Sequence, residues 1–244
     1  MNAERISVGA RTVWVKICGT TNMEDADTAV SAGANSVGFI FARGPRRIAP
    51  LDARNIVARL PATLQCVGVF VNEKPEQVRD IVTRTGMTAV QLHGDETPDY
   101  VRELFRGGPS PQELGYPAER RRLTRVLKAI RMDETAAEKI RHFAEAGELV
   151  DAFLLDSPAV VRGGSGKPFD WDAAAALLER FRSNDKLRFV IAGGLRPNNV
   201  QEAIRKLRPW GVDVVSGVER QPGMKDEAAV RDFINNVREV EPTL

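Results

Sequence analysis

The chain has 244 residues, of which 43% are hydrophobic and 28% are charged, and its formal net charge is only +2. This near balance of charge argues against a nucleic-acid partner, and no apolar run is long enough to span a bilayer or to form the core of a secretory signal. The two cysteines are too few for a disulfide scaffold and fit a reducing compartment. We therefore expect a cytoplasmic protein without nucleic-acid or membrane partners.

One pattern repeats along the chain: a short apolar, β-branched run, a glycine or polar turn, and then an amphipathic helical segment. We predict strands at residues 13–18, 36–41, 66–71, 89–92, 125–130, 152–156, 189–192 and 212–216. First-turn prolines and caps mark the predicted helix starts, at Pro50, Pro75, Pro98, Pro197, Asp133 and Asp170. Apolar strands that alternate with helices indicate a parallel sheet covered by helices.

Eight such units in a chain of this length predict an α/β fold, a closed (β/α)8 TIM barrel formed by residues 1–244 as a single domain. A doubly wound open sheet is the lesser alternative. Outside this pattern lie a polar tail at residues 1–12 and a glycine- and proline-rich stretch at residues 107–123, interpreted as an inserted surface loop. Because this loop runs from a helix to a strand, we expect it on the barrel face away from the chemistry.

The first predicted strand ends in a cysteine. Side chains alternate along a strand, so Trp14, Lys16 and Cys18 share one face, which we expect to point into the barrel. Thr21 and Glu24 have the spacing of a capping box for the helix that follows. In a barrel the active site lies at the carboxyl ends of the strands, and this pattern puts Cys18 there.

Glycine-rich turns follow the last two predicted strands. They carry Gly193 and Gly194 after the seventh strand, and Ser216 and Gly217 after the eighth. Barrels of this kind present backbone N–H groups to a phosphate at these two exits, so we predict a phosphate site, although each could be only a tight turn. Another glycine-rich stretch, at residues 162–168, lacks the spacing of a nucleotide-binding loop and is interpreted as a loop able to close over a ligand.

Short motifs occur in order along nearly the whole chain. They are residues 16–21 (Lys-Ile-Cys-Gly-Thr-Thr), 33–41, 45–48, 67–72, 90–94 (Val-Gln-Leu-His-Gly), 154–157 (Leu-Leu-Asp-Ser), 163–171, 192–200 and 212–219. Together these segments resemble the phosphoribosylanthranilate isomerase family. Two positions depart from the family pattern, Gly44 and Val215, where the family usually has serine.

The resemblance implies a barrel enzyme that converts N-(5-phosphoribosyl)anthranilate into 1-(2-carboxyphenylamino)-1-deoxyribulose 5-phosphate, an Amadori rearrangement in tryptophan biosynthesis. By position, Cys18 is the general base and Asp156 is the general acid. The residues implied to bind substrate are Arg46 at the anthranilate carboxylate, Gly193, Gly194, Ser216 and Gly217 at the phosphate, and Gly164 and Ser165 in the covering loop. We expect no metal, no cofactor, a phosphorylated sugar-anthranilate substrate as the small-molecule partner, and a monomer or homodimer.

This rearrangement needs one acid and one base. The ring oxygen must receive a proton as the sugar ring opens, and the neighbouring carbon must then lose one. Asp156 must be protonated to act as the acid, which requires a pKa above its usual value of about 4. Cys18 must become a thiolate, and Lys16 on the same face could lower its pKa, unless Lys16 pairs with an unrelated carboxylate inside the barrel.

Other functions explain fewer of these residues. A metal-dependent epimerase would need a cluster of His and acidic ligands, but the chain has only His93 and His142. A non-catalytic phosphosugar-binding protein would keep the glycine turns and would need neither Cys18 nor Asp156. His93 could line the site or only cap a turn, and Cys66, at the start of its strand, is interpreted as a buried core residue.

Overall fold

Eight parallel strands close into a barrel in chain order. They are β1 (Trp14–Cys18), β2 (Ser36–Ile40), β3 (Gln65–Phe70), β4 (Ala89–Leu92), β5 (Arg125–Arg131), β6 (Ala152–Asp156), β7 (Phe189–Ile191) and β8 (Gly211–Val214). The ring closes because Lys16 of β1 pairs with Ser36 of β2 on one side and with Asp213 of β8 on the other. This computed structural model describes residues 12–106, 125–147, 149–157 and 170–241. The predicted (β/α)8 barrel is confirmed, and the alternative of an open sheet is wrong.

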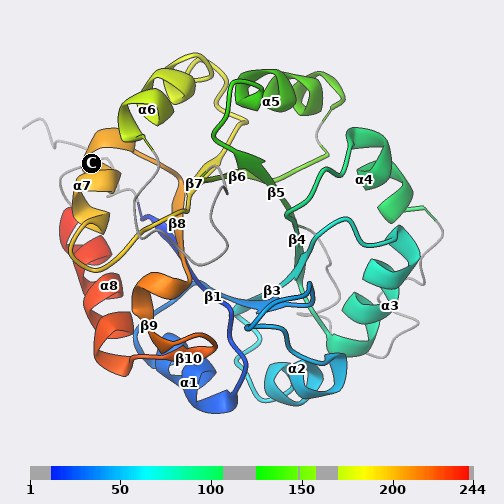
Figure 1. The fold of residues 1–244 in the computed structure, drawn as a ribbon, viewed down its shortest axis with the longest axis vertical. Coiled ribbons are helices and arrows are strands. Elements are labelled where there is room, and N and C mark those ends of the chain that lie inside the picture. Colours follow the sequence, from blue (N-terminus) through cyan, green and yellow to red (C-terminus); the bar gives the residue numbers. More distant parts are fainter. Residues whose placement is uncertain (1–11, 107–124, 148, 158–169, 242–244) are drawn as a thin grey trace, which may run out of the picture.

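A helix follows each strand, and the helices surround the barrel (Figure 1). They are α1 (Met23–Ser31), α2 (Pro50–Val57), α3 (Pro75–Thr85), α4 (Pro98–Leu104), α5 (Ala136–Glu145), α6 (Trp171–Glu179), α7 (Val200–Leu207) and α8 (Glu227–Val240). Pro50, Pro75 and Pro98 occupy first turns as predicted, because a residue there needs no N–H partner. No helix in the described ranges is long and apolar enough to cross a membrane.

The predicted capping box of Thr21 and Glu24 is wrong by one residue. The N-cap of α1 is Asn22, whose side chain accepts a hydrogen bond from the N–H of Asp25 at 2.9 Å. The hydroxyl of Thr21 donates instead to the carbonyl oxygen of Gly223, at 2.6 Å. A contact with a residue far along the chain therefore replaces the local cap.

Of the remaining helix-start predictions, Asp170 is confirmed as the N-cap of α6. Pro197 lies too early to be in the first turn of α7, whose N-cap is Asn199. Asp133 also lies before the N-cap of α5, which is Thr135, although the carboxylate of Asp133 accepts a hydrogen bond from the Thr135 N–H at 2.9 Å. These errors shift helix starts by a turn or less and leave the order of elements unchanged.

The barrel interior changes from apolar to polar along its axis. Near the amino ends of the strands, Trp14 stacks on Trp210 with 5.1 Å between ring centroids, inside a small apolar cluster. Nearer the carboxyl ends, the buried polar side chains Lys16, Gln91 and Asp213 share the interior. A second, larger apolar core lies between the strands and the helices. One end of the barrel is thus built for packing, and the other carries the polar chemistry.

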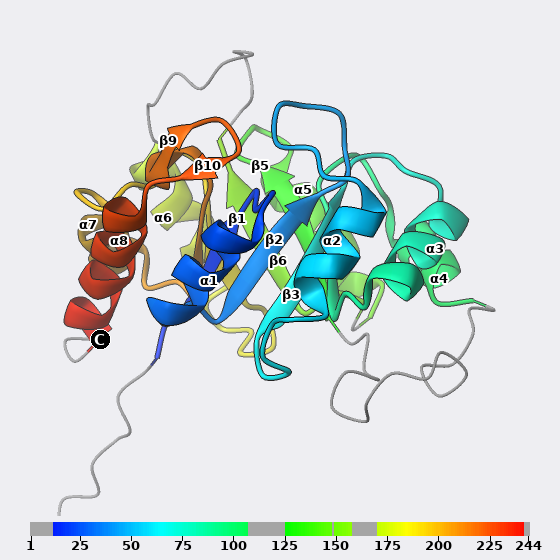
Figure 2. The ribbon, with the colours of Figure 1, turned by 90° about the horizontal axis from the view of Figure 1, so that it is seen from below.

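After β8 the chain adds a short 3-10 helix (Ser216–Val218) and a two-stranded hairpin of β9 (Glu219–Gln221) and β10 (Met224–Lys225). Figure 2 shows this hairpin at the end of the barrel toward which the strand arrows point. This is the end at which barrel active sites are built. The hairpin therefore adds its side chains to that end.

Candidate active site

Cys18 and Asp156 lie at the carboxyl ends of two strands, β1 and β6. Cys18 is 2% exposed, whereas the side chain of Asp156 is 29% exposed. Gly38 of β2 makes room for the thiol, because a Cβ atom at this position would lie 2.5 Å from Cys18 Sγ. Both predicted groups are therefore at the polar end of the barrel, one sheltered and the other accessible.

Lys16 is fully buried beside Cys18. Its ammonium group donates to Gln91 Oε1 at 2.8 Å and to Asp213 Oδ1 at 2.9 Å. Burial raises the pKa of Cys18, and the positive charge of Lys16 lowers it by less, so the net shift is upward. Both possibilities raised by the sequence therefore occur: Lys16 pairs with a carboxylate, and it also acts on the thiol.

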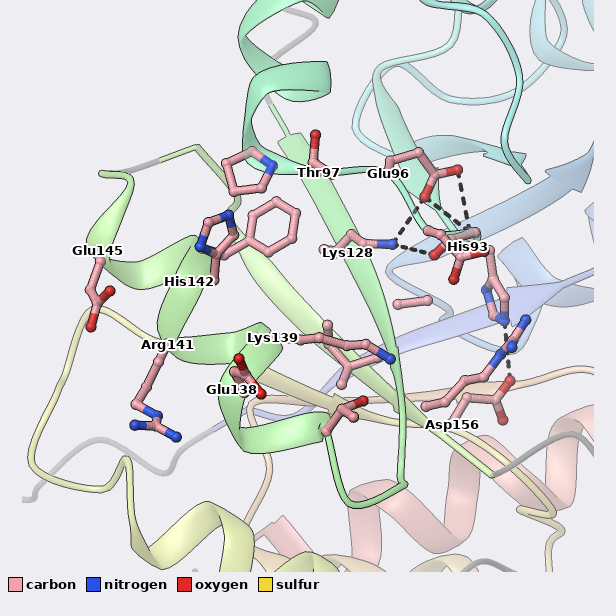
Figure 3. Close-up of a pocket in the computed structure, with 18 residues that line it drawn as sticks. His93, Glu96, Thr97, Lys128, Glu138, Lys139, Arg141, His142, Glu145 and Asp156 are labelled. Atoms are coloured by element: carbon pink, nitrogen blue, oxygen red, sulfur yellow. Dashed lines mark hydrogen bonds and ion pairs between the residues drawn. The ribbon is translucent and has the colours of Figure 1, made fainter.

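Both carboxyl oxygens of Asp156 have a hydrogen-bond partner. The N–H of Ser157 donates to Asp156 Oδ1 at 2.8 Å, and His93 Nε2 lies 3.2 Å from Asp156 Oδ2 (Figure 3). The other ring nitrogen of His93, Nδ1, lies 2.8 Å from the side-chain nitrogen of Gln91. His93 is thus bound to the predicted general acid and does more than cap a turn.

Arg46 is held by a carboxylate from the hairpin. Its Nε lies 2.9 Å from both oxygens of Glu219, and its Nη2 lies 2.7 Å from Glu219 Oε2. The buried Lys225 donates to Glu219 at 3.2 Å and to the carbonyl oxygen of Cys18 at 2.6 Å. Burial alone would raise the pKa of Glu219, but Arg46 and Lys225 hold it below its usual range. The charged carboxylate of Glu219 therefore holds Arg46 and, through Lys225, links it to the end of β1.

The glycine turns after β7 and β8 pack against each other. Gly193 and Gly194 have φ angles of 72° and 71°, in the left-handed region that favours glycine. A Cβ atom on Gly217 would run into the carbonyl oxygen of Leu195. Among the described residues, no hydrogen bond uses the N–H groups of Gly193, Gly194, Ser216 or Gly217. These N–H groups are therefore available to an anion.

A buried ion pair supports the turn that carries His93. Lys128 donates to Glu96 Oε2 at 2.9 Å and to the carbonyl oxygen of Gly94 at 2.7 Å. Glu96 also accepts from the N–H groups of Gly94, at 3.0 Å, and Asn72, at 2.8 Å. The pair thus joins β5 to the loops that follow β3 and β4.

Replacing Glu96 with alanine should lower the free energy of unfolding by about 3–5 kcal/mol, because removing one partner leaves a buried charge uncompensated. Urea denaturation followed by circular dichroism measures this loss. Glu103→Ala is the matched control, because Glu103 is exposed on α4. A loss no larger than that of the control would contradict the structural role of the pair.

A cavity of about 560 Å³ opens beside Asp156 (Figure 3). His93 and the turn after β4 line one side, and residues of α5, including His142, line the other. The described lining of this cavity includes neither Cys18 nor Arg46. The cavity therefore adjoins the predicted acid and is not by itself the predicted substrate site.

Sequence reasoning missed several polar residues that build this end of the barrel. Lys128 and Gln91 each interrupt an apolar strand, and this signal could have found them, because a buried polar group needs a partner. Lys225 lies in a polar hairpin and carries no comparable signal. Its role depends on contacts with residues far away in the sequence.

Several predictions about sites and segments lie outside the described residues. These are Gly164 and Ser165 of the predicted covering loop, residues 1–11 of the predicted tail, and the whole predicted surface loop at residues 107–123. Within the described ranges, no group of three or more His, Cys, Asp or Glu side chains is arranged to hold a metal ion. The absence of a metal or cofactor stays a prediction.

Comparison with known proteins identifies the family. Residues 15–236 match the family model described as N-(5'phosphoribosyl)anthranilate (PRA) isomerase. The N-(5'-phosphoribosyl)anthranilate isomerase of Trichlorobacter lovleyi is 44% identical, covering 93% of this chain and 98% of that protein.

Two solved structures are similar as well. The crystal structure of phosphoribosyl anthranilate isomerase from Thermotoga maritima has a TM-score of 0.77 and 39% identity, covering 93% of this chain and all of that one. A phosphoribosyl anthranilate isomerase in complex with reduced 1-(o-carboxyphenylamino)-1-deoxyribulose 5-phosphate has a TM-score of 0.73 and 38% identity over the same shares. This chain belongs to the N-(5'-phosphoribosyl)anthranilate isomerase family.

Proposed function

We propose that this protein converts N-(5-phosphoribosyl)anthranilate into 1-(2-carboxyphenylamino)-1-deoxyribulose 5-phosphate in tryptophan biosynthesis, with Asp156 as general acid and Cys18 as general base. The observation that carries the proposal is the placement of these two groups at the carboxyl ends of β6 and β1, in a chain of this family. An acid and a base at one end of a barrel suit an isomerisation that moves protons between neighbouring atoms.

In the first step Asp156 gives its proton to the ring oxygen, and the bond from that oxygen to carbon 1 breaks. The nitrogen lone pair forms a double bond to carbon 1, which gives an iminium ion. In the second step the Cys18 thiolate removes the proton from carbon 2. The electrons of that C–H bond form the double bond between carbons 1 and 2, and the C=N electrons return to nitrogen. The resulting enol becomes the ketone when its hydroxyl loses a proton and carbon 1 gains one.

Arg46 is proposed to face the anthranilate carboxylate. Its Nε and Nη2 atoms are engaged by Glu219, and no described residue engages Nη1, so this nitrogen can still donate. Glu219 thus holds the guanidinium group of Arg46 in place and leaves its Nη1 able to donate to the substrate. The roles of Gly164 and Ser165 in covering the substrate rest on the family resemblance alone.

The phosphate of the substrate is proposed to bind at Gly193, Gly194, Ser216 and Gly217, whose N–H groups have no partner among the described residues. Inorganic phosphate at tenfold above its Kd should then raise the free energy of unfolding by about 1.4 kcal/mol. Thermal denaturation with and without phosphate measures the shift.

Gly194→Val should remove the phosphate-dependent shift. Gly33→Val is the control, since Gly33 also has a positive φ, of 91°, but precedes β2 at the opposite end of the barrel. Gly33→Val should lose basal stability and keep the shift. If the full shift persists in folded Gly194→Val, the phosphate site lies elsewhere.

A turnover assay on N-(5-phosphoribosyl)anthranilate, with a chelator present throughout, tests the proposed function directly. Because burial raises the pKa of Cys18, the thiolate forms only at a pH above the ordinary range for cysteine. In a Cys66→Ala protein, which keeps Cys18 as its one cysteine, the thiolate absorbance should therefore still rise with pH beyond about 8.5. No turnover of this substrate would refute the function, and a thiolate absorbance already at its plateau by pH 7 would refute the raised pKa of the buried thiol.

The remaining features of the proposal concern the chain as a whole. We propose a single barrel domain with residues 107–123 as a surface loop, a monomer or homodimer, and a cytoplasmic location. The existence of a dimeric relative from Thermotoga maritima supports only that dimers occur in this family.

A further inference from the structure

A row of hydrogen bonds joins the interior of the barrel to Asp156. Lys16 Nζ donates to Gln91 Oε1 at 2.8 Å, Gln91 Nε2 lies 2.8 Å from His93 Nδ1, and His93 Nε2 lies 3.2 Å from Asp156 Oδ2. Lys16 is 0% exposed and Gln91 is 1% exposed, so both are shielded from bulk solvent. Whether each of these side chains donates or accepts a hydrogen bond is therefore set by its neighbours in the row.

The donors and acceptors in this row can be arranged in only one way. An ammonium group only donates, so the amide of Gln91 must turn its oxygen toward Lys16 and its nitrogen toward His93. An amide nitrogen also only donates, so Nδ1 of His93 must accept and carries no proton. A neutral imidazole has one N–H, which is then on Nε2 and points at Asp156.

We propose that Gln91 is a positioning residue that fixes His93 in its Nε2–H tautomer and so makes His93 a permanent hydrogen-bond donor to Asp156. The consequence for catalysis rests on the proposed role of Asp156 as general acid. When Asp156 gives up its proton, a carboxylate remains, and it accepts hydrogen bonds from His93 and from the N–H of Ser157. These bonds strengthen as negative charge develops, so they favour proton delivery.

The opposite tautomer would work against the reaction. With its proton on Nδ1, His93 would present a lone pair to Asp156 and would accept the very proton that the ring oxygen needs. Lys16, through Gln91, therefore sets the direction of the hydrogen bond at Asp156.

The tautomer can be read by 15N NMR, because protonated and unprotonated ring nitrogens have well separated chemical shifts. The chain has two histidines, and His142 is exposed on α5, so His142→Gln leaves His93 as the only imidazole. The spectra are recorded at pH 8, well above the model-peptide histidine pKa of about 6.5. We expect an unprotonated Nδ1 and a protonated Nε2. A protonated Nδ1, or averaged shifts from two exchanging tautomers, would overturn the proposal whatever the enzyme's activity.

A second variant tests the consequence. Gln91→Glu keeps the shape of the side chain but puts an acceptor opposite Nδ1, so it should move the proton to Nδ1 in the His142→Gln background. The kcat should fall by about 10- to 100-fold with little change in KM, because the lost bond matters most in the transition state. Gln77→Glu, on the exposed surface of α3, controls for the added charge and should leave kcat unchanged.

A double-mutant comparison separates an effect through His93 from one through Lys16 and Cys18. In a His93→Asn background, Gln91→Glu should cost much less of kcat than in the parent protein. An equal cost in both backgrounds would show that Gln91 does not act through His93 and would overturn the proposal. If Gln91→Glu does not fold, the NMR measurement on the protein with Gln91 intact still decides the tautomer. Failure of Asp156 as the acid would instead appear as near-normal turnover in Asp156→Asn.

Discussion

Replacing Cys18 with alanine should lower kcat by at least about a hundredfold, because the variant loses the base that we propose removes the proton from carbon 2. The hydrogen bond from Lys225 goes to the backbone carbonyl of Cys18, which alanine keeps, so the barrel should remain folded. Binding of a reduced product analogue, measured by calorimetry, should change far less than kcat. The phosphate turns and Arg46 do not depend on the thiol for their geometry.

Cys66→Ala is the matched control for this variant. Cys66 is also buried, but its side chain belongs to the apolar core between the strands and the helices. The control should lose some stability and keep its turnover. Near-normal turnover in a folded Cys18→Ala protein would remove Cys18 from the mechanism, whatever the family resemblance implies.

Replacing Asp156 with asparagine should also lower kcat by at least about a hundredfold, because the amide cannot deliver the proton that we propose Asp156 gives to the ring oxygen. The substitution keeps the size of the side chain, and an amide oxygen can still accept from the N–H of Ser157. Steady-state kinetics with N-(5-phosphoribosyl)anthranilate measures the loss. We expect KM to change less than kcat, since Asp156 makes no contact with the proposed phosphate site.

Asp151→Asn controls for a general effect of removing a carboxylate near β6. Asp151 precedes the strand at the opposite end of the barrel, where its carboxylate accepts from the N–H of Val126 at 2.7 Å. An asparagine can accept the same bond, so turnover should be unchanged. If Asp156→Asn were no more impaired than this control, another group would have to be the acid.

The barrel could be predicted from the sequence because each of its strands and helices is indicated by residues that are close together in the chain. Each strand is a short apolar run and each helix is amphipathic, and this alternation leaves few topologies. The rule that barrel active sites lie at the carboxyl ends then located Cys18 and Asp156, although their roles came from the family resemblance.

The supporting contacts could not be predicted because they join residues that are far apart in sequence. Lys16 pairs with Asp213, and Arg46 pairs with Glu219 of the hairpin. The capping box failed for the same reason, since Thr21 is bound to Gly223 rather than to its own helix. Local patterns thus predicted where the two proposed catalytic groups lie, and long-range polar contacts decide how their surroundings are held.

The central claim is that Cys18 acts as the base and Asp156 as the acid, and a kinetic isotope effect tests it most directly. Substrate carrying deuterium at carbon 2 is compared with unlabelled substrate under conditions in which chemistry limits the rate. Residual turnover by Cys18→Ala should show the larger isotope effect, because removal of the carbon 2 proton is then the slow step. Residual turnover by Asp156→Asn should show a smaller effect, because ring opening is slow instead. Equal isotope effects, or a larger one in Asp156→Asn, would contradict the assignment of base to Cys18 and acid to Asp156.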